Sequence, residues 1–182
     1  MSADMIPLLT KALGETVYMV VVSMVIATII GMPLGVLLHT TSKGQILESL
    51  AVNRIVGAIV NAVRSIPFIG RQVETSLKEV PFGLVEAAQS MGATPAQIIW
   101  KVLLPESMSS IVAQLTTVII SLVGESAMAG AVGGGGLGDL AIRYGYQRFR
   151  PEIMLATVVI LIVLVQLVQF VGNTLAKRLD KR

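Results

Sequence analysis

Cysteine is absent from the 182 residues, and histidine occurs only once, at His39. The absence of cysteine excludes disulfide bonds, thiolate metal sites and cysteine nucleophiles. One histidine cannot build a metal site, so His39 is expected to lie at the membrane interface and no metal is expected. Charged residues are also scarce, at 14%, whereas about a quarter of the residues of ordinary globular proteins are charged. With 54% hydrophobic residues, the composition predicts an all-α integral membrane protein with a single domain.

The motifs of the common catalytic classes are missing as well. The chain has no G-x-x-x-x-G-K-[ST] phosphate loop, no nucleophile elbow and no zinc-binding helix motif, so we expect no catalytic residue, no cofactor and no enzyme activity. The letters GGGGLG at 133–138 satisfy the dinucleotide-binding pattern. However, an apolar run precedes them where a strand is required, and no acidic partner follows about 20 residues later. A tightly turned segment at the end of a span explains these glycines better.

Three uncharged runs are long enough to cross a membrane, which requires about 20 residues. The spans predicted from these runs cover about 17–38, 107–124 (extending toward 138) and 152–176, the third of which begins at the charged Glu152. The first run contains Gly31 and Gly35, a GxxxG pair that we interpret as a packing seam. The third carries Gln166, Gln169 and Asn173 on one helical face, which should therefore point toward protein and not toward lipid.

The region between the first two spans is more polar. Residues 46–66 have an amphipathic helical pattern and are too often charged to cross a membrane. A break is expected at 65–68, followed by a polar helix over 71–79.

Residues 82–104 read as two short helices joined by a tight turn. Gly92 is suited to end the first helix, and Thr94 and Gln97 form a Thr-x-x-Gln capping box that starts the second. Pro95 fits the first turn of that second helix. Pro105 then ends the helix or bends it into the next apolar run.

Basic residues set the orientation, because cytoplasmic loops retain lysine and arginine. Ten of the 14 lie on the side that carries residues 82–104 and the C-terminus, which are both predicted to be cytoplasmic. Two helices joined by a turn also outline a DNA-binding motif, so a membrane-anchored regulator is one alternative. Lys101 is the only basic residue between Phe82 and Pro105, which argues against nucleic acid as a partner.

The spacing of Glu86-Ala87-Ala88, Gly92, Val102 and Leu104-Pro105 resembles the EAA loop of ATP-binding-cassette (ABC) importer permeases. More narrowly, the segments RSIPF, EAAQSMGATPAQIIWKVLLPE and LVGESAMAGAVGGGGLGDLAIRYGYQR, together with the C-terminal span, are similar to the permeases of methionine importers. The resemblance implies a permease of the bacterial inner membrane that carries methionine or a related amino acid. It also implies a second permease copy, a cytoplasmic ATPase dimer that binds ATP, and an extracytoplasmic substrate-binding protein.

This resemblance assigns candidate site residues. The residues expected to dock on the ATPase are Glu86, Ala87, Ala88, Met91, Gly92, Ala93, Leu104 and Pro105. From the helical pattern, Leu84, Val85, Ala88 and Met91 are expected to face a groove on that partner. Pathway candidates are Glu125, Ser126, Met128 and Gly134. For Glu125, contact with an ammonium group or a basic partner and simple solvation at the interface are both open.

The chain departs from that family at one place. Residues 65–68, SIPF, join directly to IGRQ at 69–72, where such permeases have the rest of one span and most of another. On the order of 30 to 40 residues are missing, which leaves three spans in place of five. A truncated membrane protein that does not transport is therefore a second alternative.

Overall fold

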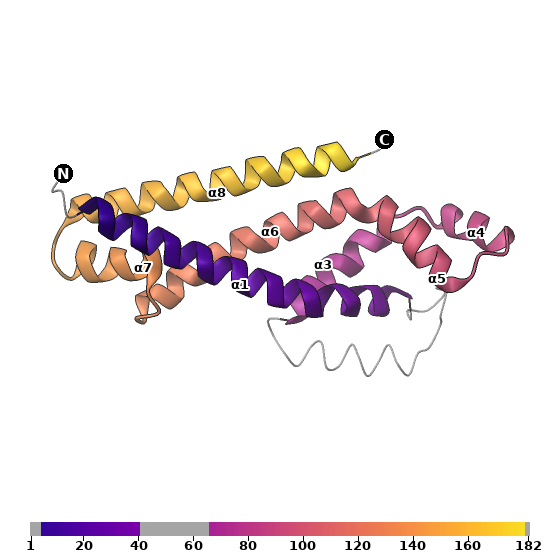
Figure 1. Cartoon of the computed structure of the whole chain (residues 1–182), viewed down its shortest axis with the longest axis horizontal. Coiled ribbons are helices and arrows are strands. Elements are labelled where there is room, and N and C mark those ends of the chain that lie inside the picture. Colours follow the sequence, from indigo (N-terminus) through magenta and orange to yellow (C-terminus); the bar gives the residue numbers. More distant parts are fainter. Residues whose placement is uncertain (1–4, 41–65, 181–182) are drawn as a thin grey trace. The chain divides into compact units, whose positions relative to one another are not determined.

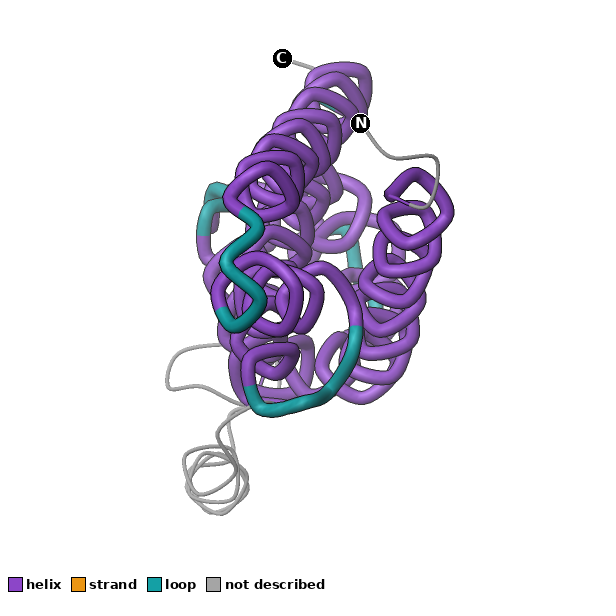
Figure 2. Tube along the Cα trace, turned by 90° about the vertical axis from the view of Figure 1, so that its left-hand side faces the viewer, coloured by secondary structure: helices purple, strands orange, loops and turns teal. Residues whose placement is uncertain are grey.

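The computed structural model describes residues 5–40 and 66–180, and in these ranges every regular element is helical (Figure 1, Figure 2). The elements in chain order are α1 (Met5–Thr40), α3 (Ile66–Lys78), α4 (Phe82–Ser90), α5 (Pro95–Ile98), the π-helical turn η1 (Ile99–Leu103), α6 (Leu104–Ala131), α7 (Gly136–Leu140), a second π-helical turn η2 (Ala141–Tyr146) and α8 (Pro151–Leu179). The all-α fold predicted from the sequence is confirmed.

Three helices are long and apolar enough to cross a membrane. They are α1 with 36 residues, the continuous helix Pro95–Gly130 with 36, and α8 with 29. Each is longer than the uncharged run from which a span was predicted, because charged residues occupy its ends, such as Lys11 and Glu15 in α1. The expectation of three membrane helices is confirmed, and the sequence ranges given for them remain predictions.

Two compact units divide the described residues. The first combines the chain up to Val25 with Thr116–Val171, and the second combines Ile26–Leu115 with Gly172–Arg182. The core of the first unit is a cluster of buried apolar side chains from α1, α7 and α8: Met5, Leu9, Ala12, Leu137, Leu140 and Ile153. The α1 members recur at helical spacing, so one face of α1 is buried there.

In the second unit, α1 crosses α3 at the predicted GxxxG pair. A Cβ atom on Gly35 would lie 2.6 Å from the carbonyl oxygen of Gly70, and one on Gly31 would lie 2.8 Å from Cβ of Ile69. Only glycine allows the two backbones to come this close, so the predicted packing seam is confirmed. Ile69, Val73 and Leu77 form the buried face of α3 and are each 1% exposed.

α3 differs from the helix predicted over 71–79. It begins at Ile66, so residues 66–68 are helical and the predicted break is the start of this helix. Pro67 falls in its first turn, where a missing N–H removes no helical hydrogen bond. Glu74 is nearly buried, and its carboxylate is paired with Arg71 at 3.3 Å and Lys78 at 2.7 Å. The amphipathic helix predicted over 46–66 lies, apart from Ile66, outside the described residues.

Candidate functional site

The turn between α4 and α5 is closed by its own backbone. The N–H of Gly92 donates to the carbonyl of Gln89 at 2.9 Å, and the N–H of Ala93 donates to the carbonyl of Ala88 at 3.1 Å. These two bonds form a Schellman motif, which requires a left-handed residue, and Gly92 has φ +77°. The predicted role of Gly92 is confirmed.

The start of α5 is closed in the same self-contained way. The N–H of Gln97 donates to Oγ1 of Thr94 at 3.4 Å, and the N–H of Thr94 donates to Oε1 of Gln97 at 2.9 Å. This pair of bonds is the predicted capping box, with Pro95 in the first turn of the helix. No residue outside 88–97 takes part in these hydrogen bonds, so the turn is a locally specified unit.

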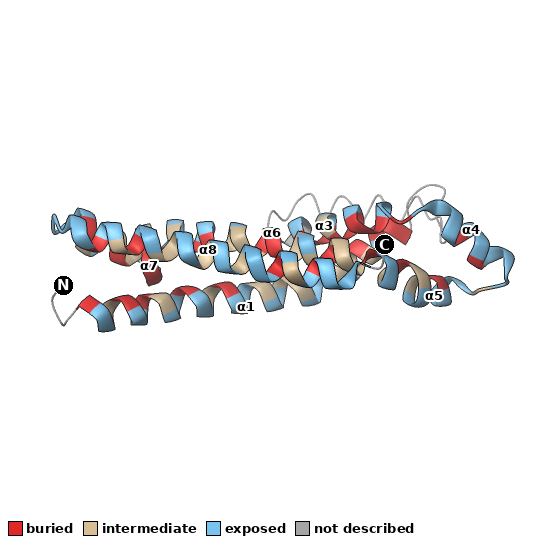
Figure 3. Ribbon diagram, turned by 90° about the horizontal axis from the view of Figure 1, so that it is seen from above, coloured by how far each residue is buried: buried red, intermediate tan, exposed pale blue. Residues whose placement is uncertain are grey.

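The apolar side chains of α4 do not form a single outward face. Val85 and Ala88 are 2% and 5% exposed, because α4 contacts α5 and η1 on that side. For these two residues, the expectation of a face open to a partner is wrong. Leu84 and Met91, the other two, are 41% and 82% exposed. Figure 3 shows the tip formed by α4 and α5 as largely exposed.

The remaining docking candidates lie around the same turn. Glu86, Ala87, Gly92 and Pro105 are exposed, whereas Ala93 and Leu104 are half-buried. The structure therefore brings most of the predicted docking residues to the surface near one turn, and Ala88 is the exception. Their role in docking remains a prediction.

Pro105 neither ends nor interrupts the second helix. Immediately before it, η1 forms a wider turn in which the N–H of Leu104 donates to the carbonyl of Ile99, five residues earlier. Proline has no N–H and its ring crowds the preceding turn, and a π-helical turn accommodates both problems. Consequently α5, η1 and α6 form one helix from Pro95 to Gly130. A second helix that continues into a span is not free to enter a DNA groove.

The glycine-rich segment after α6 is a sharp turn, as predicted. Gly133, Gly135 and Gly136 all have positive φ. A Cβ atom on Gly138 would collide with the carbonyl oxygen of Ala127, and one on Gly130 would collide with the backbone N of Asp139. The start of α7 is therefore packed directly against the last turns of α6.

Two side chains of α1 hold this turn in place. Oε2 of Glu15 accepts from the N–H of Gly136, and Oγ1 of Thr16 accepts from the N–H of Leu137, both at 2.9 Å. These acceptors satisfy N–H groups that a helix leaves unpaired at its N-terminus. Sequence reasoning missed both residues, because 121 positions separate them from their donors. The only signal is a carboxylate and a hydroxyl directly before a long apolar run.

The pathway candidates occupy α6 and the turn after it. Glu125, Met128 and Gly134 are exposed, and Ser126 is 9% exposed. Oγ of Ser126 has no hydrogen-bond partner among the described residues. Both Glu125 and Ser126 line a pocket of about 350 Å³ whose other walls are Tyr18, Met19, Val20, Val22, Ser23, Leu122 and Ala129. The structure thus brings two of the four candidates together with α1.

The polar residues of the third span also point outward. Gln166, Gln169 and Asn173 are all exposed, and of the three only Gln166 lines a pocket shared with α6 in the described part of the chain. Within the same ranges, no group of three or more His, Asp or Glu side chains could hold a metal ion. The expectation that the protein needs no metal or cofactor stays a prediction.

Three helices that could cross a membrane, one of them continuous with the second helix of a helix pair, define the class of a multi-pass membrane protein. The sequence matches the family described as "Binding-protein-dependent transport system inner membrane component" over residues 5–182. The chain belongs to this family, and it is a permease subunit of an ABC importer.

Known relatives are similar over most or all of the chain. "Probable D-methionine transport system permease protein MetI" of Vibrio cholerae serotype O1 is 47% identical over 210 residues, covering 96% of this chain and 93% of the relative. The D-methionine permease MetI of Escherichia coli K12 is 40% identical over 165 residues, covering 71% and 76%. A solved structure of "the MetNI methionine ABC transporter" in inward-facing conformations has a TM-score of 0.94 at 38% identity, covering 100% of both chains. The resemblance to methionine importer permeases is confirmed.

The aligned lengths bear out the missing internal segment. The Vibrio alignment has 210 positions, whereas 96% of 182 residues is about 175, so about 35 positions have no counterpart in this chain. The Escherichia alignment has 165 positions against about 129 residues, which again leaves about 36. Both values fall in the expected range of 30 to 40 residues.

Proposed function

We propose that this permease carries methionine or a related small amino acid across the inner membrane, driven by ATP that a separate ATPase dimer binds and hydrolyses. The names of the relatives support the substrate, and the absence of a phosphate loop from the sequence supports a separate ATPase. A second copy of the permease and an extracytoplasmic binding protein complete the assembly. The excess of basic residues favours a cytoplasmic C-terminus and α4–α5 turn.

The continuity of α5, η1 and α6 is the observation that carries this proposal. The turn around Gly92 is closed by its own hydrogen bonds, so a partner that pushes on it moves the turn as a unit. Because Pro95–Gly130 is one helix, that displacement reaches the membrane span directly. The exposed side chains of Leu84, Glu86 and Met91 are the contacts available to the ATPase.

Alternating access follows from this linkage. Closure of the ATPase dimer on ATP brings the two α4–α5 turns of a permease dimer together, and the spans open toward the binding protein. Hydrolysis reverses the movement and opens the pathway to the cytoplasm. The chain supplies no catalytic group, and its contribution is a two-state arrangement of helices that the partners bias.

The pocket beside α6 is the proposed section of the pathway. Its volume of about 350 Å³ lies at the lower end of the range for small-molecule sites. Ser126 offers a buried hydroxyl without a described partner, and Glu125 offers a carboxylate that can meet the ammonium group of an amino acid. Met128 and Gly134 lie further along the same polypeptide segment.

Co-purification with the ATPase subunit and uptake of methionine test the docking role together. Gly92→Asp places a side chain where φ is +77°, so we expect it to distort the turn and abolish both association and uptake. Gly83→Asp is the matched control, because Gly83 lies in α4 with open space around it and no positive φ. It adds the same charge without disturbing the turn and should retain association.

Each result has a separate meaning. If the unsubstituted chain never associates with an ATPase, the permease function fails for this polypeptide. If it associates but does not take up methionine, the chain is a docking-competent protein without a pathway, which the gap of about 35 aligned positions would explain.

The role of Glu125 is tested by uptake at constant protein level. If the carboxylate meets the substrate, Glu125→Gln lowers uptake at least about tenfold, the effect of roughly 1.4 kcal/mol. Glu152→Gln is the control, since Glu152 is an exposed carboxylate of the same unit outside this pocket. Unchanged transport in Glu125→Gln would assign Glu125 to the solvated interface.

A further inference from the structure

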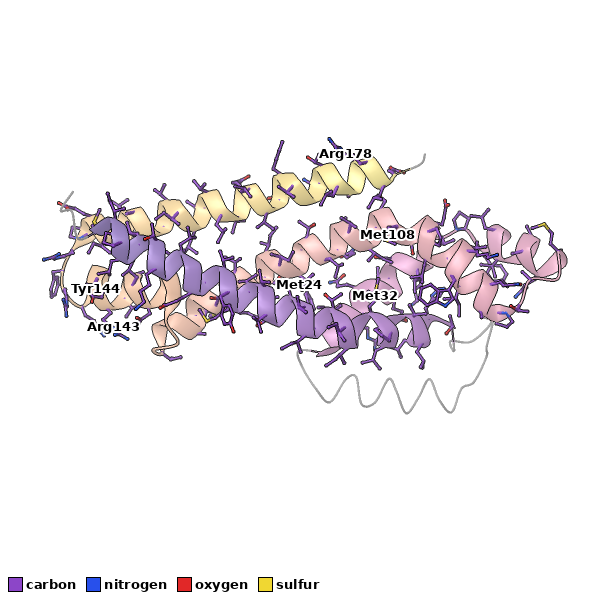
Figure 4. All side chains as sticks on the ribbon, in the orientation of Figure 1. Met24, Met32, Met108, Arg143, Tyr144 and Arg178 are labelled. Atoms are coloured by element: carbon purple, nitrogen blue, oxygen red, sulfur yellow. The ribbon has the colours of Figure 1, made fainter. Side chains whose placement is uncertain are left out.

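An apolar groove opens beside η1 in the second unit. Its volume is about 680 Å³, and it is lined by Met32, Pro33, Val36, Ile99, Trp100, Leu104, Pro105, Met108 and Leu179. The groove is lined by residues of α1, η1, α6 and α8. Figure 4 labels two of the lining residues, Met32 of α1 and Met108 of α6, and also Arg178, which precedes the lining residue Leu179 in α8. We propose that this groove binds one acyl chain of an anionic phospholipid, whose headgroup is held by the basic residues around it.

The lining selects a hydrocarbon occupant. No lining residue is charged, and the tryptophan indole is the only side chain in the groove with a polar N–H. A polar partner would leave its own hydrogen-bonding groups without partners against these walls, at a cost that an acyl chain does not incur. The volume is also within the range of sites that bind small ligands.

The polar side chains of the same region lie on another face of α6. Glu106, Ser107, Ser109, Ser110 and Gln114 line a separate pocket of about 400 Å³, which also contains Glu79 and Asp180. The start of α6 therefore separates an acidic, hydroxyl-rich side from the apolar groove. The carboxylates of this region line this second pocket, and none of them lines the groove.

Three cations lie close along the chain to residues that line the groove. Lys101 follows the lining residue Trp100 and precedes Pro105 by about one turn, so it lies on the same side of the helix as the groove. Lys177 and Arg178 stand in the last turn of α8, next to the lining residue Leu179. All three side chains are exposed, and none pairs with an acidic residue of the described chain. An anionic headgroup would supply the missing counter-charge.

Trp100 marks the depth at which the groove opens. Its side chain is 73% exposed, and tryptophan next to lysine is typical of the interface between hydrocarbon and headgroups. The boundary between the headgroup and the acyl chain of the bound lipid would then lie at the level of Trp100, with the cations on the headgroup side. Basic sites between transmembrane helices are a known mode of binding for anionic lipids.

Trp100 is also the only tryptophan of the chain, so tryptophan fluorescence reports on this one position. The purified full chain is placed in phosphatidylcholine bilayers that contain a small fraction of either phosphatidylglycerol or phosphatidylcholine brominated on the acyl chains. Bromine quenches tryptophan on contact. We expect the brominated phosphatidylglycerol to quench Trp100 several times more strongly than brominated phosphatidylcholine at equal mole fraction.

Two substitutions test the charge of Lys101 and the volume of the groove separately. Lys101→Gln should reduce the preference for phosphatidylglycerol about fivefold, the effect of one cation near an anionic surface. Val36→Phe fills the groove and should reduce quenching by both lipids. Lys11→Gln and Val163→Phe are the matched controls, because both positions are exposed and neither lies in the second unit. Neither control should change the quenching.

Two outcomes would overturn the proposal. Equal quenching by both brominated lipids would show ordinary contact with the bilayer and no headgroup selection. Absence of quenching by either lipid would show that protein covers the groove. The measurement needs neither ATPase nor transport, so it succeeds or fails independently of the proposed function.

Discussion

The two glycine turns of this chain solve different physical problems. At the α4–α5 turn, Gly92 is required only for its φ of +77°, since a Cβ atom there would have nothing within 4 Å. At the α6–α7 turn, glycine is required for space as well, because Gly130 and Gly138 bring two backbones into direct contact. The first turn is closed by its own residues, whereas the second depends on Glu15 and Thr16 of α1.

The difference separates a turn that is held by its own residues from a turn that is held by a distant helix. A turn whose hydrogen bonds are all local keeps its shape when it moves, which suits a loop that a partner displaces. A turn held by a distant helix keeps its shape only while that helix stays in place. We therefore expect substitutions to act on coupling at the first turn and on folding at the second.

Gly138→Ala should have the largest effect. The added methyl group would collide with the carbonyl oxygen of Ala127, a backbone atom that cannot move aside without disturbing α6. We expect a loss of about 3 kcal/mol and a large fall in the yield of monodisperse protein in detergent. Gly124→Ala in α6 is the control, since it has open space and should be neutral or slightly stabilising. Equal yields would show that the two backbones separate easily.

Thr16→Val tests the long-range tie next. Valine keeps the shape of threonine but leaves the buried N–H of Leu137 without an acceptor, which costs about 1 to 3 kcal/mol. The apparent midpoint of thermal unfolding should fall, while association with the ATPase is retained in the protein that stays folded. Loss of association without a change in the midpoint would contradict the separation of the two turns.

Gly92→Ala should be milder in stability, at about 1 kcal/mol, because a left-handed alanine is strained but meets no neighbouring atom. Gly92→Asn should lose less, since asparagine tolerates this conformation. The predicted order of ATPase co-purification is therefore glycine, asparagine, alanine. An alanine variant that associates as well as the original would remove the conformational argument for this position.

Glu15→Gln should have the smallest effect. The amide oxygen still accepts from the N–H of Gly136, and only the attraction between a negative charge and a helix N-terminus is lost, at about 0.3 to 1 kcal/mol. Thermal unfolding at low and high salt measures it, and the difference from the original should shrink as salt rises. A loss as large as that of Thr16→Val would mean that the carboxylate has a further role.

Local chemistry explains which parts of the structure could be predicted. The turn at Gly92, Thr94 and Gln97 was predictable because every bond in it joins residues that are close in sequence. The three long helices were predictable because each apolar run has about the number of residues that a membrane span needs.

The rest depends on contacts that no local pattern encodes. The bonds from Glu15 and Thr16 to the glycine-rich turn cross 121 positions. The burial of Val85 and Ala88 follows from packing of α4 against η1, which is visible only after the chain has turned. The helix also continues through Pro105, because the π-helical turn before it accommodates a proline, a residue that usually ends a helix.

The helix Pro95–Gly130 is longer than the membrane it crosses. At about 1.5 Å per residue, its 36 residues extend for roughly 54 Å, whereas the hydrocarbon layer is about 30 Å thick. Some 20 Å of the same rod must therefore stand outside the hydrocarbon. The turn at Ile99–Leu103 is the stretch of this rod whose hydrogen bonding is π-helical, and we expect it to be the most easily deformed. The compliance of this π-helical turn would then determine how much of a displacement of the α4–α5 turn reaches the membrane-spanning part of the helix.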